Sequence, residues 1–378
     1  MTNPFQYGGI VEGAAFCNRK QELADLTAAM ESSAKLFLYS ERRLGKTSLV
    51  KHALHALPRK HFTTAYVDLS PTDGEASFAT KTARAITASM SSTASQLLET
   101  AAQFFSRLAP SITTDAEGRP MITFGTSAGV LPEPELEEVL AAPARIAAHG
   151  KRRVVVVFDE AQQVMEYPND LVERRLRSII QKQQNVSYVF LGSRKHLIQK
   201  MFLDRARPLY RSAGHYPLGP IEVKHWLPFI GKKFRDGGKP IDDEAIRAVC
   251  KLTEGHPFYT QHLCHALWEI AEPGAPVTQA LIAHAVNVLL DRESYAFTAL
   301  WESLTINQKR ALKGLASEPA GVRPFTGDFV RRYGMGSASN AQRAVEGLLA
   351  RDLIDRNNGS FVITERFFRI WIAQRQLQ

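Results

Sequence analysis

The sequence predicts an α/β fold: a parallel β-sheet flanked by helices, followed by a helical segment and a small C-terminal domain of helices and a β-hairpin. Three observations predict it. Apolar strand patterns alternate with helical patterns up to residue 219, which implies parallel strands with helices on both faces. Residues 154–158 form a continuous β-branched and aromatic run, typical of a strand buried on both faces. From residue 221 to about 293 the pattern is helical throughout, and it changes again after Trp301.

The elements expected around the sheet follow in chain order. Its strands are expected at residues 36–39, 63–69, 154–158, 186–192 and 215–219. Its helices are expected at residues 19–32, directly after the first strand, from Pro132 and Pro134 to Gly150, and at 170–184. Residues 91–150 are helical apart from an interruption at 112–130, where alternating flanks surround Asp115–Gly118. This interruption predicts a hairpin insertion.

The last 80 residues have the pattern of a winged helix. Three short helices are expected at residues 305–316, 326–333 and 339–350. Residues 351–363 then alternate around the turn signal Asp355–Gly359, which predicts a hairpin. The expected domains are therefore a core at residues 1–219 with an insertion at about 91–150, a helical domain at 220–295 and a winged-helix domain at 296–378.

Composition is that of a globular protein with an anionic partner. Of the 378 residues, 44% are hydrophobic and 22% are charged, both ordinary values for such a chain. The sequence contains no apolar run long enough to cross a bilayer and no secretory signal pattern, so we expect a cytoplasmic protein that does not contact a membrane. The three cysteines lack metal-ligand spacing and are expected in the core. The net charge of +9 favours an anionic partner such as a nucleotide or nucleic acid.

The first expected strand leads into a phosphate-binding motif. Residues 36–51 read LFLYSERRLGKTSLVK, a strand, a loop that closes on Gly45-Lys46-Thr47, and a helix. This is the layout of a P-loop, whose backbone N–H groups cradle phosphate oxygens. Lys46 is expected to contact the outer phosphates and Thr47 to hold Mg²⁺. The other residues expected at the nucleotide are Ser40, Arg42, Arg43, Leu44, Gly45 and Ser48.

One position departs from the pattern G-x-x-x-x-G-K-[ST]. Ser40 stands where the pattern has its first glycine. Because serine is small and the position lies at the strand end, outside the phosphate cradle, we expect Ser40 to be tolerated.

The strand at 154–158 ends in two acids, Asp159 and Glu160. Asp159 is expected to hold Mg²⁺ together with Thr47, and Glu160 to polarise the attacking water as general base. A bland interpretation is that the two acids only stabilise the start of a helix. The phosphate-binding motif earlier in the chain makes the functional interpretation the stronger one.

Cationic side chains elsewhere in the core are candidates to complete the site. Ser193 and Arg194 follow the strand at 186–192 and are expected to point towards the γ-phosphate, where Arg194 would stabilise charge. A loop serine and a solvated arginine remain an equal alternative. Candidates for a further arginine, in cis or from a neighbouring subunit, are Arg205, Arg207 and Arg211.

The winged helix carries candidate DNA-binding residues. Residues 301–378 contain 12 Lys/Arg against 7 Asp/Glu. On the third expected helix, Ser339, Asn340, Gln342 and Arg343 are expected to be exposed, with Arg356 on the wing. Ordinary solvated faces are the alternative, because winged helices also dock proteins.

Seven motifs in order resemble a known family. The chain resembles archaeal-type P-loop ATPases of the STAND group, close to the AAA+ ATPases. The matching stretches are NPFQYG at 3–8, FCNRKQEL at 16–23, YSERRLGKTSL at 39–49, FDEAQ at 158–162, LGSR at 191–194, PLYR at 208–211 and GHP at 255–257. The resemblance implies a core, a helical lid and a winged helix. It also implies a base pocket near Phe16 and Arg19, with Pro257 near the phosphates or ribose; a capped helix start is the alternative for Phe16 and Arg19.

The motifs together predict an ATP-binding and ATP-hydrolysing molecular switch whose nucleotide state controls the winged helix. Its cofactors are expected to be ATP and Mg²⁺, and its turnover slow or partner-stimulated. The winged helix would bind double-stranded DNA, a protein partner or a second copy of the chain. Two alternatives stay open: a DNA-binding initiator or regulator tuned by nucleotide, and a signalling scaffold that hydrolyses ATP slowly or not at all.

Overall fold

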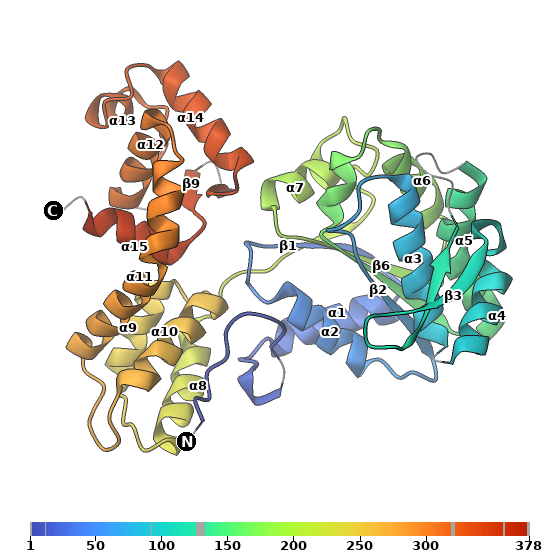
Figure 1. The fold of residues 1–378 in the computed structure, drawn as a ribbon, viewed down its shortest axis with the longest axis horizontal. Coiled ribbons are helices and arrows are strands. Elements are labelled where there is room, and N and C mark those ends of the chain that lie inside the picture. Colours follow the sequence, from blue (N-terminus) through green and yellow to red (C-terminus); the bar gives the residue numbers. More distant parts are fainter. Residues whose placement is uncertain are drawn as a thin grey trace. The chain divides into compact units, whose positions relative to one another are not determined.

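The computed structural model describes residues 2–11, 13–91, 93–125, 133–318, 322–357 and 360–375. The chain divides into two compact units. The sheet unit consists of Arg19–Ser40 and Lys46–Leu218, and the helical unit consists of Met1–Asn18, Glu41–Gly45 and Gly219–Gln378. Figure 1 shows the elements of both. The short loop segment Glu41–Gly45 thus belongs to the helical unit although both of its flanks belong to the sheet unit.

A five-stranded parallel sheet forms the centre of the sheet unit, as the sequence predicts. Its strands are β1 (Lys35–Tyr39), β2 (Phe62–Asp68), β5 (Arg153–Asp159), β6 (Val186–Gly192) and β7 (Gly214–Pro217). They lie in the order β2-β5-β6-β1-β7, and every pair is parallel. Strand β6 is buried at every position, because both faces of the sheet are covered.

Helices cover both faces of this sheet. Helices α1 (Lys20–Glu31) and α2 (Lys46–Ala56) lie on one face (Figure 1). The other face is covered by α3 (Glu75–Met90), α5 (Glu133–Gly150), α6 (Leu171–Ile180) and α7 (Lys195–Leu203). On this second face, Phe37, Phe158, Tyr188 and Phe190 of the strands pack in one apolar core with Phe202 of α7. The helix predicted at 170–184 therefore exists but ends at Ile180.

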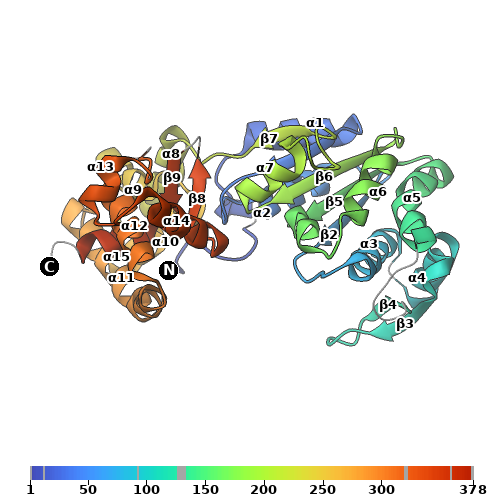
Figure 2. The same cartoon turned by 90° about the horizontal axis from the view of Figure 1, so that it is seen from above.

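The predicted hairpin insertion is present. Helix α4 (Ala94–Phe104) and the 3₁₀ turn η2 (Ser106–Leu108) precede the antiparallel strands β3 (Pro110–Thr114) and β4 (Pro120–Phe124), which lie at the far end of the unit beyond α3 (Figure 2). Asp115 accepts hydrogen bonds from the backbone N–H groups of Glu117 (3.1 Å) and Arg119 (2.8 Å), which closes the turn. Residues 126–130 of the predicted interruption and the predicted helix start at Pro132 lie outside the described residues.

The helical unit begins with four helices that include the helical segment predicted from residue 221. They are α8 (Val223–Asp236), α9 (Asp243–Thr253), α10 (Pro257–Ile270) and α11 (Gln279–Glu302). Two of them start with a side-chain cap: Asp242 accepts from the N–H of Ala245, and Thr278 from that of Leu281. Pro257 is the first residue of α10, where its missing N–H costs nothing.

A winged helix completes the helical unit. It contains α12 (Ile306–Ser317), α13 (Gly327–Arg332), α14 (Ala338–Ala350), β8 (Ile354–Asn357), β9 (Ser360–Ile363) and α15 (Arg366–Gln374). The three predicted helices and the hairpin are confirmed, although residues 358–359 of the predicted turn lie outside the described residues. Helix α15 was not predicted from the sequence. Its aromatic residues Phe367, Phe368 and Trp371 are buried against the rest of this unit. Within the described part of the chain, no helix is long and apolar enough to cross a membrane.

Candidate functional site

The carboxyl ends of three parallel strands bring the motif residues to one edge of the sheet. Asp68 and Asp159 are register partners at the ends of β2 and β5, and Tyr39 and Gly192 are partners at the ends of β1 and β6. Ser40 and Ser193 therefore follow neighbouring strands, and Glu160 follows the next strand. This edge is where parallel α/β sheets bind their ligands.

Lys46 begins α2 and its ammonium group points back to the end of β1. The residue is 6% exposed. Its Nζ donates to Ser40 Oγ at 2.9 Å and lies 3.5 Å from the Ser40 carbonyl oxygen. The sequence analysis placed Ser40 outside the phosphate cradle, yet its hydroxyl directly contacts the lysine expected to bind phosphate. A glycine at this position would leave Lys46 without that acceptor.

Thr47 and Asp159 meet at a single carboxylate oxygen. Thr47 Oγ1 donates to Asp159 Oδ2 at 3.0 Å, and Tyr66 of β2 donates its hydroxyl to the same oxygen. Burial raises the pKa of the Asp159 carboxyl, opposed by the hydrogen bond from Tyr66, and the charge of Glu160 raises it further. Burial and the neighbouring Asp159 also raise the pKa of Tyr66, so the phenol keeps the proton that it donates.

These residues fit a magnesium ion. Mg²⁺ prefers oxygen ligands and is usually held by one or two protein oxygens together with phosphates and water. The hydroxyl of Thr47 and the carboxylate of Asp159 converge from α2 and β5, and both are oxygen donors. Tyr66 was not predicted as a site residue, because its strand carries no motif. The sequence predicted only that residues 63–69 form a strand.

The Glu160 carboxylate accepts hydrogen bonds from two neighbouring side chains. Its backbone lies in the left-handed region, with φ at 52°. Its Oε2 accepts a hydrogen bond from Ser193 Oγ at 2.7 Å and another from Gln162 Nε2. The acid expected to act as general base thus contacts the serine expected at the γ-phosphate. Gln162 lies two residues after Glu160, and its hydrogen bond to the Glu160 carboxylate was not predicted from the sequence.

Gly192 leaves room for this arrangement. A Cβ atom at this position would lie 2.8 Å from Gln162 Oε1 and 2.8 Å from Ile198 Cβ. Both distances are shorter than atoms of these kinds tolerate. The last residue of β6 must therefore be small for Gln162 to contact Glu160.

The candidate arginines of the sheet unit differ in their surroundings. Arg194 forms an ion pair with Glu166, and both side chains are partly exposed. Arg207 forms an ion pair with Glu173, whose side chain is fully buried. Arg205 is exposed, and the Arg211 guanidinium lies 5.3 Å from the centre of the Tyr210 ring. Arg207 is thus engaged in a structural contact, whereas Arg205 and Arg211 lie at the surface of this unit.

The loop segment Glu41–Gly45 contacts the C-terminal part of the helical unit. Arg42 Nη2 lies 2.9 Å from Asp352 Oδ2, and Arg366 Nη2 lies 2.6 Å from Glu41 Oε2. The Arg43 guanidinium lies 4.3 Å from the centre of the Phe258 ring.

Backbone and buried groups add to these contacts. His256 Nε2 donates to the Arg42 carbonyl oxygen at 3.0 Å, and Leu44 is buried. Gly45 has a φ of +86°, a conformation that favours glycine. Arg42 and Arg43, predicted to surround phosphate, thus also contact the start of α10 and the residue Asp352 before β8, and the neighbouring Glu41 contacts the start of α15.

The remaining predicted nucleotide residues lie in separate elements. Arg19 is buried at the start of the sheet unit, with a φ of 71° and an ion pair to Glu22 at 2.7 Å. Ser48 is buried in α2, and its carbonyl oxygen lies 2.8 Å from His52 Nδ1. Phe16 and Pro257 belong to the helical unit. A base pocket formed by these residues stays a prediction.

The predicted DNA-binding residues lie on α14 and on the wing. Ser339, Gln342, Arg343 and Arg356 are exposed. Asn340 is half-buried: its Nδ2 donates to the Met335 carbonyl at 3.1 Å and its Oδ1 accepts from Arg343 at 2.8 Å. The amide of Asn340 therefore stabilises the start of α14, and Arg343 is the residue on this helix most able to reach a phosphate.

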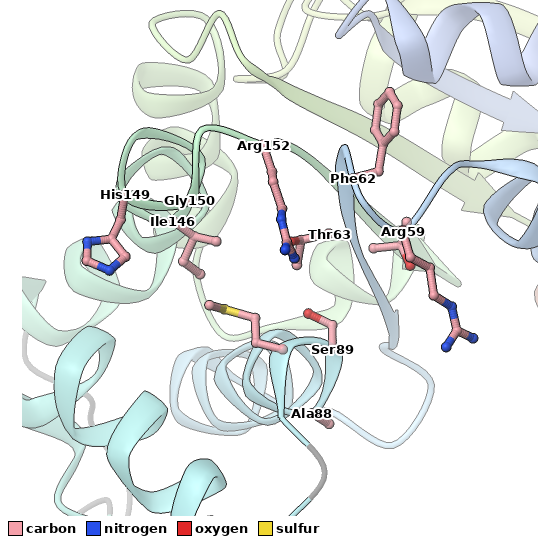
Figure 3. A pocket seen from close by; sticks show the side chains of 11 residues that line it. Arg59, Phe62, Thr63, Ala88, Ser89, Ile146, His149, Gly150 and Arg152 are labelled. Atoms are coloured by element: carbon pink, nitrogen blue, oxygen red, sulfur yellow. The ribbon is translucent and has the colours of Figure 1, made fainter.

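A cavity of about 540 Å³ lies at the opposite edge of the sheet, near the start of β2 and the ends of α3 and α5 (Figure 3). Its polar lining includes Arg59, Thr63, Ser89, His149 and Arg152. Helix carboxyl ends carry partial negative charge, which accounts for cations at this edge. None of the predicted nucleotide residues lines the cavity.

Comparison with known proteins identifies both parts of the chain. The profile of a family described as an ATPase domain predominantly from Archaea matches residues 16–263, and that of a probable winged helix domain matches residues 295–374. No curated protein matches the sequence.

Solved structures share the fold at low sequence identity. A Walker-type ATPase of Pyrococcus abyssi is 15% identical, with a TM-score of 0.65 over 97% of this chain and 99% of its own. The ORC2 protein of Aeropyrum pernix, solved with ADPNP and ADP, is 13% identical, with a TM-score of 0.54 over 95% of this chain and 94% of its own. At these identities the likeness supports the fold alone.

Proposed function

Because the chain belongs to the family of ATPase domains found predominantly in Archaea, we propose that it is a switch that binds and hydrolyses ATP and thereby controls its winged helix. One observation carries the ATPase part of this proposal. Lys46, Thr47, Asp159, Glu160 and Ser193 lie at one edge of the sheet, where Thr47 bonds to Asp159 and Ser193 bonds to Glu160. Lys46 bonds to Ser40 at the same edge.

Each residue has a definite task in nucleotide binding. Lys46 exchanges the Ser40 hydroxyl for the outer phosphates of ATP, since an ammonium group binds a phosphate anion more strongly than a neutral oxygen. Thr47 and Asp159 hold Mg²⁺, which when bound neutralises phosphate charge and orients the triphosphate. The N-terminus of α2, which starts at Lys46, adds the positive partial charge of a helix N-terminus to the phosphate site.

Hydrolysis depends on Glu160. Its carboxylate accepts the proton of the attacking water as general base. Ser193 and Gln162 hold the same carboxylate oxygen, so they fix the direction in which it faces. Because Ser193 follows the strand next to β1, it is also placed to sense the γ-phosphate. Arg207 is held by the buried Glu173, so Arg194, Arg205 and Arg211, in cis or from a second copy, are the candidates to stabilise the transition state.

The control of the winged helix rests on the loop segment Glu41–Gly45. This segment precedes Lys46 directly, and its Glu41 and Arg42 form ion pairs with Arg366 and Asp352 of the winged helix. Nucleotide at Lys46 changes the charge beside this segment. Since Glu41 and Arg42 contact the winged helix and lie in the loop that leads to Lys46, nucleotide binding at Lys46 biases the contacts of the winged helix.

The hydrolysis step is tested with Glu160→Gln, which keeps the size of the side chain and removes the base. We expect this variant to bind ATP about as tightly as the wild type and to turn it over about 100-fold more slowly. Equilibrium ATP binding and steady-state phosphate release measure the two properties. Wild-type turnover by Glu160→Gln would remove Glu160 from the role of base.

Double-stranded DNA is the partner that the exposed cations favour. Arg343 on α14 and Arg356 on the wing are exposed, and the C-terminal 78 residues carry the excess of basic residues noted above. Side chains on this helix and wing suit phosphate contacts. A protein partner is the second candidate, since the same cations fit an acidic surface.

DNA binding is tested by fluorescence anisotropy with a labelled duplex at two salt concentrations. We expect affinity to fall steeply with salt, and the pair Arg343→Glu and Arg356→Glu to weaken it at least tenfold. Lys224→Glu on α8, an exposed cation outside the winged helix, is the matched control. Duplex affinity that is absent or unaffected by the pair would favour a protein partner.

A further inference from the structure

Tyr66 lies beside the phosphate-binding motif without belonging to any motif. It is the fifth residue of β2 and pairs in register with Val157 of β5, two residues before the ends of both strands. Its ring lies beside α2: Lys51 Nζ is 5.2 Å from the ring centre. Lys51 follows Thr47 by four residues, so both project from the same side of that helix.

The hydroxyl of Tyr66 completes the hydrogen bonding of Asp159. Asp159 Oδ2 accepts from Tyr66 and from Thr47 Oγ1, and Asp159 Oδ1 accepts from the backbone N–H of Glu160 at 2.9 Å. A carboxylate oxygen has about two lone-pair positions. Both positions of Oδ2 are therefore taken, and Oδ1 keeps one for a further donor such as metal-bound water.

Three donors from three elements thus fix how the Asp159 carboxylate is rotated. Without the Tyr66 hydroxyl, only the Thr47 hydroxyl and the Glu160 N–H would hold the buried carboxylate, so its rotation about the Cβ–Cγ bond would be less restricted. Groups that orient a metal ligand in this way contribute substantially to metal affinity: their removal typically costs ten- to a hundredfold.

On this basis, and resting on the proposed function, we propose that Tyr66 is a positioning residue that holds Asp159 in the orientation required for Mg²⁺. Its contact in the site is with Asp159. Its effect is exerted through Asp159, and it sets how much Mg²⁺ the site needs in order to bind ATP.

The test is Tyr66→Phe, which keeps the ring and removes only the hydroxyl. ATP binding is measured by titration calorimetry at a series of Mg²⁺ concentrations and again with EDTA. We expect the Mg²⁺ concentration for half-maximal enhancement of ATP affinity to rise about tenfold. The affinity in EDTA should stay that of the wild type, because Lys46 and the loop are unchanged.

Tyr188→Phe is the matched control. Tyr188 is a buried tyrosine of β6 in the same sheet, and its hydroxyl donates to Gln183 Oε1 at 2.7 Å, away from the motif residues. Its removal should leave the Mg²⁺ dependence as in the wild type. If the substitutions only loosened the sheet, the Mg²⁺ dependence of ATP affinity would change equally in both variants, or ATP affinity in EDTA would fall as well. Either result would overturn the proposal.

An unchanged Mg²⁺ dependence in Tyr66→Phe would also overturn it while leaving the proposed function intact. Failure of the proposed function looks different, because wild-type protein would then not bind ATP at any Mg²⁺ concentration. Thermal unfolding of both variants in the absence of nucleotide confirms that each is folded in the titration.

Discussion

Glu173 and Arg207 form an ion pair inside the sheet unit. This contact indicates that Arg207 has a structural role, unlike the other candidate arginines. The Glu173 side chain is 0% exposed and that of Arg207 is 23% exposed. Burial raises the pKa of the Glu173 carboxyl, and the charge of Arg207 opposes part of this rise. A buried carboxylate without its partner is costly, so the contact requires Arg207 for stability.

Replacing Arg207 with alanine is therefore expected to destabilise the fold by about 3–5 kcal/mol. Urea unfolding followed by circular dichroism measures this loss. Arg205→Ala, at an exposed position two residues earlier, should change stability little. If Arg207→Ala unfolded like the wild type but lost ATP turnover, Arg207 would return as a catalytic candidate.

At the residue scale, the sequence predicted the residues that carry a motif and missed those that only support them. Lys46, Thr47, Asp159 and Glu160 could be named because the spacing of their motifs reflects phosphate and metal chemistry. Tyr66 and Gln162 could not. The contact of Tyr66 with Asp159 depends on β2 and β5 being neighbours and on their register, which the local pattern does not contain. Gln162 lies in the matching stretch at 158–162, but its contact with Glu160 depends on the turn of the backbone after β5.

Ser40 lies between these two groups: it belongs to a motif, but its role in the site was not predicted. Its position was recognised, but it was judged only as a departure from glycine. Its hydroxyl acts as an acceptor for Lys46, a role that depends on the direction of the side chain of the first residue of α2.

At the element scale, the loop segment Glu41–Gly45 and the winged helix form a connected set of contacts. Arg366 at the start of α15 lies between Glu41 (2.6 Å) and Glu254 (3.2 Å), and Asp352 before β8 contacts Arg42. We expect these contacts to restrict the conformations of the loop. A loop ordered in advance binds its ligand with a smaller loss of entropy.

Loosening the segment should therefore weaken nucleotide binding. Asp352→Asn removes one charge of the Arg42 pair, and we expect ATP to dissociate about three- to tenfold faster, which corresponds to about 1 kcal/mol. A stopped-flow chase of a fluorescent ATP analogue measures the rate.

Asp328→Asn provides the control, since Asp328 pairs with Arg331 on the exposed side of α13 in the same winged helix. Identical dissociation rates for the two variants and the wild type would contradict a link between the loop and the winged helix.

The elements were predicted well where their patterns are local. The strands β1, β2, β5 and β6 follow from their apolar and β-branched residues, and the helices of the winged helix follow from their caps and periodicity. Helix α15 was not predicted, although Arg366 and Arg369 are three residues apart among apolar residues and its three aromatic residues are buried. The neighbours that bury it come from distant parts of the chain.

At the scale of the whole molecule, chain order and spatial grouping differ. Residues 1–18 and 41–45 belong to the helical unit, although they precede or interrupt the sheet unit in sequence. The sequence predicts the order of a core, a helical segment and a winged helix, because each has its own periodicity. It does not predict that a loop from the core groups with the C-terminal residues, because that grouping arises from ion pairs between residues more than 200 positions apart.

The net charge of +9 is also a property of the whole molecule. A large positive charge steers anions to the protein and makes its association with them dependent on salt. Both ATP and DNA fit this charge, so it supports an anionic ligand without separating the two.

Steady-state ATP hydrolysis by the wild type and by Lys46→Ala tests the central claim most directly. The proposed function predicts Mg²⁺-dependent turnover in the wild type, at least a tenfold loss in Lys46→Ala, and no loss in Lys60→Ala, an exposed lysine that precedes β2. Turnover in Lys46→Ala equal to that of the wild type would contradict the assignment of this edge of the sheet as the ATP site.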